Sequence, residues 1–393
     1  MNRRVTAIAC VTYVALFCAA SSAHGTTQAK HKLPKPVQMD RDVVLIRDAR
    51  TGELILRRNR GADNIDAEAP ASRSGLLLRV HVNLVEVSCN VFAPDGTAVR
   101  GLNESDFRVF EDGVQQKISH FDASSEGASI ALVMDASPSV LPDSTAMKAA
   151  AQQLIAGLSP VDEVAVADFS QHTFLLLPFS RDRQLLSKAI SGVDVRALFG
   201  DTGGSNIYRS LYLVANEIFP GRTGKKAIIL LTDGQDSGLG LSLYGAGVRS
   251  HDGSPQHRAT FEDVVRALSA QGIEVYAIST QNRPRVMTPQ WLTSHQADSL
   301  ITPAALTLGI PAYTAFLAEL VRRVGGQLYF LNEVGTVAGA YRSIVRRLSA
   351  QYTLGYYPAA GRKPGWHSLS VEVLGHGAAR VVNRPAYYQA AEN

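Results

Sequence analysis

The sequence predicts an α/β domain with a doubly wound, mostly parallel sheet, inserted in a small β-sandwich. Between residues 128 and 350, short apolar runs alternate with segments of helical period, which is typical of parallel strands joined by crossover helices. On either side, residues 76–127 and 351–393 have a period of two, and neither stretch is long enough to bury a core alone. We therefore expect these two flanks to pair with each other and form the sandwich.

Within 128–350 the expected elements alternate regularly. The first apolar run, residues 130–134, is long enough for a strand that is buried on both faces. Further predicted strands are 164–169, 174–177, 227–231, 274–278 and 328–331. Predicted helices are 145–158, 183–190, 207–219, 261–270, 315–324 and a last one that ends near 349. Right-handed crossovers between parallel strands place such helices on both faces of the sheet.

The flanking and inserted segments have a different composition. Residues 24–75 read as a linker, in which 43–46 and 54–56 could close a hairpin that is mobile unless it docks. The sandwich strands are expected around Val85–Val91, at 107–110, and after the α/β domain at 352–356, 368–373 and 380–382. Two stretches rich in Gly, Ser and Pro, 237–260 and 280–314, are expected to be surface loops.

The first residues resemble a secretory leader in three respects: Arg3 and Arg4, an apolar core at 5–20, and a small-residue cleavage site ending at Ala23. We expect residues 1–23 to be removed, which leaves a secreted or periplasmic protein without a stable membrane span; an uncleaved anchor is the alternative. Cys89 would then be the one remaining cysteine, which excludes an internal disulfide and a cysteine-based metal site. A formal net charge of +4 without a basic stripe does not favour nucleic-acid binding.

Oxygen-bearing side chains follow the predicted strands. Asp135, Ser137 and Ser139 come directly after the first strand, and Asp233 comes directly after the strand 227–231. Between them, Ser205 opens the helix at 207–219. Carboxyl ends of parallel strands meet at one edge of a sheet, where ligands bind, and oxygen-only groups suit a hard divalent cation. Each group also has a simpler interpretation, either as a helix N-cap or as a β-turn residue.

This order of residues resembles the metal-ion-dependent adhesion site of the von Willebrand factor type A domain, written DxSxS, then Thr, then Asp. Asp135, Ser137 and Ser139 match the first element, Ser205 stands at the Thr position, and Asp233 matches the last. The resemblance implies a Rossmann-like sheet, with Ser137 and Ser139 binding the metal directly and the other three residues binding it directly or through water. Pro138, where the family usually has Gly, would require a rearranged loop if that position needs positive φ.

Two further segments, FRVFEDG at 107–113 and YTLGYY at 352–357, resemble a bacterial group of secreted proteins known as the Acidobacterial VWFA-related family. The resemblance implies a binding function, in which Mg²⁺ is the expected ion, with Mn²⁺ and Ca²⁺ as alternatives. An Asp or Glu of a protein partner would complete its coordination.

Two other functions stay open: a structural module with a silent metal site, and a metal-dependent hydrolase. We expect no enzyme, because the sequence shows no GxSxG nucleophile elbow and no evident general base beside the site. Asp168 and His172 near one strand end are expected to form a surface turn and not an acid–base pair.

Overall fold

A computed structural model describes most of the chain from Lys32 onward. The described residues are 32–41, 43–47, 54–58, 84–123, 127–194, 205–237, 259–288, 291, 307–331, 337–359 and 362–389. Residues 33–393 form one compact unit, and of the other unit, residues 1–32, only Lys32 is described. The expected leader, most of the 24–75 linker, most of the first insertion and about half of the second lie outside the described residues.

The central sheet has seven strands in the order β1-β10-β9-β8-β11-β12-β13. β8, β9, β11, β12 and β13 are parallel, whereas β10 runs antiparallel to β9 and β1 antiparallel to β10. The strands are β1 (Val37–Gln38), β8 (Ser129–Asp135), β9 (Glu163–Phe169), β10 (Thr173–Ser180), β11 (Lys226–Thr232), β12 (Ile273–Ser279) and β13 (Gln327–Phe330). The mostly parallel sheet predicted from the alternating pattern is confirmed.

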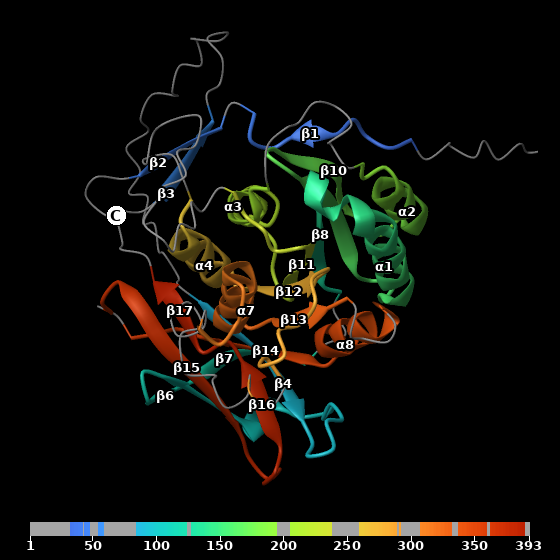
Figure 1. The fold of residues 1–393 in the computed structure, drawn as a ribbon. Coiled ribbons are helices and arrows are strands. Elements are labelled where there is room, and N and C mark those ends of the chain that lie inside the picture. The colour runs from blue at the N-terminus through green and yellow to red at the C-terminus, as the bar shows by residue number, and fades with distance from the viewer. Residues whose placement is uncertain are drawn as a thin grey trace, which may run out of the picture. The chain divides into compact units, whose positions relative to one another are not determined.

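Helices cover both faces of this sheet (Figure 1). One face is covered by α1 (Ser144–Gly157), α2 (Arg183–Ser191) and α8 (Val337–Ser349). The other is covered by α3 (Ile207–Glu217), α4 (Phe261–Ala270) and α7 (Ala312–Val324). Alternate residues of β8 serve the two faces, since Leu132 packs in the first apolar cluster and Val133 in the second. This explains why its apolar run is unbroken.

The flanking segments form two antiparallel sheets that share one apolar core. The first has the order β16-β4-β14-β7, with β4 (Val85–Phe92), β7 (Ile118–Asp122), β14 (Gln351–Tyr356) and β16 (Arg380–Asn383). The second has the order β17-β15-β5-β6, with β5 (Phe107–Glu111), β6 (Val114–Gln116), β15 (Gly365–Val373) and β17 (Ala386–Gln389). Each sheet combines strands from before and after the α/β domain, so the predicted pairing of the flanks is confirmed. Cys89 is buried in this core as a free thiol, and its pKa is raised, mainly by burial.

Polar contacts join the sandwich to the amino ends of the central strands. Gln351 Nε2 at the start of β14 donates to Glu274 Oε1 at the start of β12 over 2.7 Å. The Lys226 ammonium lies 3.5 Å from Glu86 of β4. Buried Arg384 donates to the backbone carbonyls of Glu86 and Ser269. The sandwich is therefore attached at the edge of the sheet opposite to the carboxyl ends of its parallel strands.

The described residues between 33 and 58 pack onto the α/β domain. Strands β2 (Val43–Arg47) and β3 (Leu54–Arg58) pair as a hairpin at the position where the sequence suggested one. Val43 and Leu45 are buried against the α3–α4 face, and Tyr212 of α3 donates its hydroxyl hydrogen to the Leu54 carbonyl over 2.7 Å. Trp291 of the second insertion packs on a small cluster around Met287 and Ile310. Among the described helices, none is long and apolar enough to cross a membrane.

Candidate metal centre

Asp135 ends β8 and is the centre of a group of hydroxyls at the carboxyl edge of the sheet. Its side chain is buried, and the residue is 2% exposed. Thr232 donates to Asp135 Oδ2 over 2.6 Å, the Ser137 backbone N–H donates to Oδ1 over 2.9 Å, and the Ser205 hydroxyl lies 3.5 Å from Oδ2. Parallel pairing of β8 with β11 brings these groups together, because Met134 stands opposite Leu231 in the ladder.

The turn after β8 holds two serines side by side. Ser137 Oγ lies 3.1 Å from Ser139 Oγ; Ser137 is buried and Ser139 exposed. Pro138 is the first residue of a short 3-10 helix, η2 (Pro138–Asp143). Proline suits a first helical position, because its φ is already near the helical value and its missing N–H would have no partner there. Asp112 is the one non-glycine residue with positive φ among the described residues, so Pro138 does not require the rearrangement that the sequence suggested.

Ser205 precedes α3 and is buried beside Asp135. Its position is fixed by Ser237, whose hydroxyl accepts from the Ser205 N–H over 3.1 Å and whose N–H donates to the Ser205 carbonyl over 2.7 Å. Asp236, one residue earlier, accepts from the Tyr208 N–H in the first turn of α3 over 3.1 Å. The turn after β11 therefore holds the start of α3. The preceding glycine-rich residues, 200–204, lie outside the described residues.

Asp233 follows β11 directly and is almost fully buried, with 1% exposed. Gln235 occupies both of its carboxylate oxygens: the backbone N–H donates to Oδ1 over 2.9 Å and Nε2 donates to Oδ2 over 3.0 Å. Gly234 has a φ of +84°, and a Cβ there would lie 2.7 Å from Leu317 of α7. The turn therefore needs glycine both for its backbone conformation and for the close approach of the helix.

Thr232 is the functional residue that the sequence reasoning missed. Besides its bond to Asp135, its hydroxyl oxygen accepts from the Gly234 N–H over 3.0 Å, so it connects the two turns that carry the aspartates. The signal was available in principle. Leu231 of β11 pairs with Met134 of β8, so the next residues of the two strands, Thr232 and Asp135, stand beside each other.

Electrostatics at this edge favour binding of positive charge. The pKa of Asp135 is raised from 3.8 to about 6, mainly by burial, and the nearby Asp233 charge adds to the effect. Hydrogen bonds from Ser137 and Thr232 oppose the rise. The pKa of Tyr313, at the start of α7, is raised by burial and by the negative charge of Asp233. In the described part of the chain, neither aspartate has a Lys, Arg or His as an ion-pair partner.

The two residues considered as an acid–base pair do not form one with each other. His172 Nδ1 lies 2.8 Å from Asp40 Oδ2, so its recorded partner is the turn after β1. Asp168 is buried in β9 with 1% exposed, so the expectation that it lies in a surface turn is wrong.

The donor set fits a hard divalent cation. All five side chains named from the sequence carry oxygen and lie at one edge, which is the ligand type that Mg²⁺ prefers. An octahedral Mg²⁺ with bonds of about 2.1 Å places neighbouring ligand oxygens about 3 Å apart. The separation of 3.1 Å between Ser137 Oγ and Ser139 Oγ matches that edge.

Comparisons with known proteins concern the fold. Residues 130–235 match the family model described as the von Willebrand factor type A domain, and no curated protein matches the chain. An aerotolerance-related membrane protein from Bacteroides fragilis is 15% identical, covering 56% of this chain and 98% of its own, with a TM-score of 0.38. A von Willebrand factor type A protein from Catenulispora acidiphila is 13% identical, covering 80% of this chain and 76% of its own, with a TM-score of 0.36.

The matched residues run from β8 to the turn after β11, which are the strands that carry Asp135 and Asp233. The sheet around them is doubly wound and mostly parallel. Residues 130–235 therefore belong to a von Willebrand factor type A domain.

Proposed function

We propose that the carboxyl edge of the central sheet binds a divalent cation, and that a carboxylate of a partner protein completes its coordination. The observation that carries this proposal is the environment of Asp135. A buried carboxylate with a raised pKa, surrounded by hydroxyls and a second aspartate, has no compensating positive charge among the residues that the structure describes. A divalent cation would supply that charge.

Ser137 and Ser139 are the direct ligands in this proposal, because their oxygens are already spaced for neighbouring positions. Asp135 and Ser205 would bind directly or through water. Asp233 would act through water, since Gln235 holds both of its oxygens. Mg²⁺ is the proposed ion, and Mn²⁺ and Ca²⁺ have the same preference for oxygen.

Few anionic direct ligands would leave the bound cation able to accept a further carboxylate. Ser139 is exposed, so a partner has access to the edge from that side. We propose a protein partner that presents Asp or Glu, met outside the cytoplasm as the leader-like residues 1–23 suggest. This is a binding function and not an enzymatic one.

Calorimetric titration of the EDTA-stripped full chain with Mg²⁺, Mn²⁺ and Ca²⁺ tests the metal. We expect Asp135→Ala and Ser139→Ala to weaken binding about 100-fold or more, and Ser119→Ala, on the exposed side of β7, to leave it unchanged. No heat with any ion would favour the alternative, a structural module with a silent site.

Partner capture on immobilised wild-type protein, with excess Mg²⁺ or with EDTA, tests the second half of the proposal. Proteins retained with Mg²⁺ and released by EDTA should be absent from the Ser139→Ala column. Equal retention in Mg²⁺ and EDTA would rule out recognition through the metal.

A further inference from the structure

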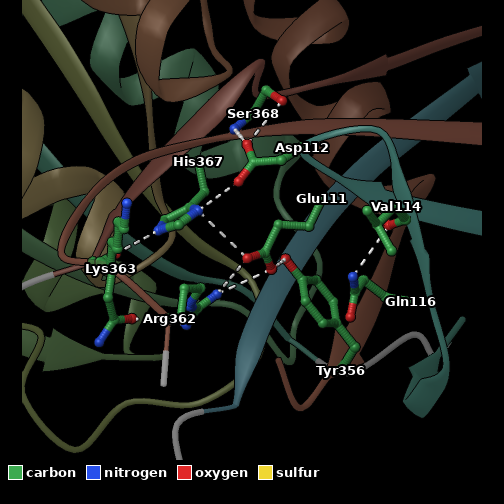
Figure 2. Close-up of polar contacts among 10 residues, drawn as sticks. Glu111, Asp112, Val114, Gln116, Tyr356, Arg362, Lys363, His367 and Ser368 are labelled. Atoms are coloured by element: carbon green, nitrogen blue, oxygen red, sulfur yellow. Dashed lines mark hydrogen bonds and ion pairs between the residues drawn. The ribbon is translucent and has the colours of Figure 1, made fainter. Parts of the chain in front are cut away.

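A second group of metal-ligand side chains lies in the β-sandwich, away from the edge just described. Glu111, Asp112 and His367 each offer one ligand atom, and these atoms all lie within 4.8 Å of one another. Figure 2 shows the three side chains converging from the end of β5 and from β15. Their closeness was not visible in the sequence, where Asp112 and His367 are 255 residues apart.

The backbone at Asp112 explains why two consecutive carboxylates meet. Consecutive residues of a strand normally point to opposite faces of the sheet. Asp112 leaves β5 with a φ of +50°, and Gly113 follows with +79°, which forms a tight turn into β6. The Asp112 side chain thereby turns toward β15, beside that of Glu111, as Figure 2 shows.

Hydrogen bonds fix which atoms of His367 face the acids. Nε2 lies 2.9 Å from the Lys363 carbonyl, which only accepts, so Nε2 carries a hydrogen. Nδ1 lies 2.7 Å from Asp112 Oδ2 and 3.5 Å from Glu111 Oε1. If the imidazole is neutral, the lone pair of Nδ1 faces two negatively charged carboxylates, which repel it. This arrangement requires a cation among them, either a proton on Nδ1 or a metal ion.

The atoms of the three side chains that point away from the centre of the cluster form hydrogen bonds, as the non-coordinating atoms of metal ligands usually do. Asp112 Oδ1 accepts from the Ser368 N–H over 2.8 Å and from its hydroxyl over 3.1 Å. Glu111 Oε2, its second oxygen, accepts from the Tyr356 hydroxyl over 2.5 Å and from Arg362 Nη1 over 3.0 Å. Arg362 Nη1 also donates to Oε1 over 2.8 Å, so the oxygen that faces His367 is shared with the guanidinium. A histidine whose other N–H binds a carbonyl, and carboxylates with hydrogen-bonded second oxygens, are the usual surroundings of a metal.

Burial and access also suit an ion. The side chains of His367 and Glu111 are 9% and 7% exposed, whereas that of Asp112 is 52% exposed. The site therefore has an apolar inner side, with Tyr387 stacked on the imidazole at 5.5 Å between ring centres, and an open outer side. Arg362 already balances one of the two negative charges, which limits the affinity of the cluster for a cation.

We propose that Glu111, Asp112 and His367 bind Zn²⁺, with the fourth position open to water. One imidazole nitrogen and two carboxylate oxygens form a set that zinc accepts, and tetrahedral zinc places its ligand atoms about 3.3 Å apart. The Nδ1–Oε1 separation of 3.5 Å is close to that value. The Nδ1–Oδ2 separation of 2.7 Å is shorter, so the exposed Asp112 carboxylate moves outward when the ion replaces the Nδ1 proton.

The test measures zinc bound per chain after dialysis of the EDTA-stripped full chain against low micromolar Zn²⁺ with excess Mg²⁺. We expect one zinc that is lost in His367→Gln and in Asp112→Asn, and kept in His376→Gln, which replaces an exposed histidine elsewhere. Asp112→Asn keeps the size and the turn preference of the residue, so it guards against a folding defect in the histidine variant. Ser368→Ala should weaken zinc binding about 10-fold.

One further readout separates this site from the edge of the central sheet. Ser139→Ala should hold as much zinc as the wild type, whatever happens to its Mg²⁺ binding. Absence of zinc from the wild type, or equal zinc in Asp112→Asn, would overturn the proposal and leave a hydrogen-bonded imidazolium in its place.

Discussion

The edge of the central sheet and the Glu111 cluster of the sandwich both bury carboxylates, but they stabilise the charge differently. Asp135 is surrounded by hydroxyls and by Asp233, and burial raises its pKa to about 6. Asp112 accepts hydrogen bonds from His367 and Ser368, and these bonds hold its pKa below the usual value of 3.8. Glu111, beside it, is paired with Arg362. The first arrangement stores an unbalanced negative charge, whereas the second is nearly balanced within the protein.

This difference separates a site that needs an added cation to balance its charge from one that also acts as a structural joint without an ion. A group of oxygens without internal cations gains free energy when a cation arrives, so its folded state is tuned for a ligand. A group with its own Arg and His gains most of that free energy on folding, and it fastens β5 to β15 whether or not an ion is present. Removal of the Arg362 cation should therefore destabilise the protein. Removal of the Asp135 negative charge should stabilise the metal-free protein.

The largest expected effect is that of Arg362→Ala in the sandwich. It leaves the buried Glu111 carboxylate with the Tyr356 bond and with His367 Nδ1 at 3.5 Å, and loss of one partner of a buried pair typically destabilises by about 3–5 kcal/mol. Urea denaturation of the metal-free protein measures it. The double variant Glu111→Gln, Arg362→Met should recover most of the loss, and a change below about 1 kcal/mol in the single variant would show that the pair is not a structural joint.

Asp135 should make the metal-free protein less stable as the pH rises. Its folded pKa lies above the unfolded value, so the folded state holds the extra proton between about pH 4 and pH 6. Stability from this group is full below about pH 4 and is lost as the pH rises through 6. A pKa raised from 3.8 to about 6 corresponds to a loss of about 3 kcal/mol.

Denaturation of the wild type and Asp135→Asn in EDTA at several pH values isolates this effect, because other titrating groups cancel in the pair. The amide should be the more stable variant above pH 6, and saturating Mg²⁺ should remove its advantage by binding the wild type alone. Parallel pH profiles of the two proteins would show that the Asp135 charge is compensated by another group.

Thr232→Val should have a smaller effect at the same edge. It removes the donor to Asp135 and the acceptor for the Gly234 N–H while keeping the shape of the side chain, at about 1–3 kcal/mol. Thr232→Ser keeps the hydroxyl and serves as the matched control. The valine should also weaken Mg²⁺ binding, since Asp135 then loses its shortest hydrogen bond; unchanged affinity would limit Thr232 to a structural role.

The smallest effect is expected at Pro138. Replacement by Gly increases the freedom of the unfolded chain and should destabilise by about 0.4–1 kcal/mol. Mg²⁺ affinity should not improve, because Pro138 already has the conformation that η2 needs. A marked gain in affinity would indicate that the proline distorts the turn.

The positions of Asp135 and Asp233 could be predicted because each follows an apolar run directly, and a parallel sheet brings such positions to one edge. Thr232 was not singled out, because its place beside Asp135 follows only from the register of β8 with β11, and neither strand indicates that register by itself. β17 and the two-residue β1 were not predicted, since strands this short depend on the partners β15 and β10.

The contact of Asp112 with His367 in the sandwich could not be predicted from the sequence, for a different reason. Asp112-Gly113 has the sequence of a turn and indeed forms one. Nothing local indicates that its carboxylate meets His367, because that contact depends on the register of β5 with β15, in which Glu111 stands opposite Leu369. Register between segments so distant in sequence is set by the whole core and not by either segment.

The pairing of β7 with β14 has a consequence for how the α/β domain is connected. Asp122 ends β7 and stands opposite Thr353 near the start of β14, so the two strands are the arms of a hairpin. The loop of that hairpin is the α/β domain from β8 to α8, which is all of it except the short strand β1. A short turn in its place would leave the sandwich strands in register. The same closure holds both ends of the domain at the amino edge of its sheet and leaves the edge with Asp135 and Ser139 as the free tip of the loop.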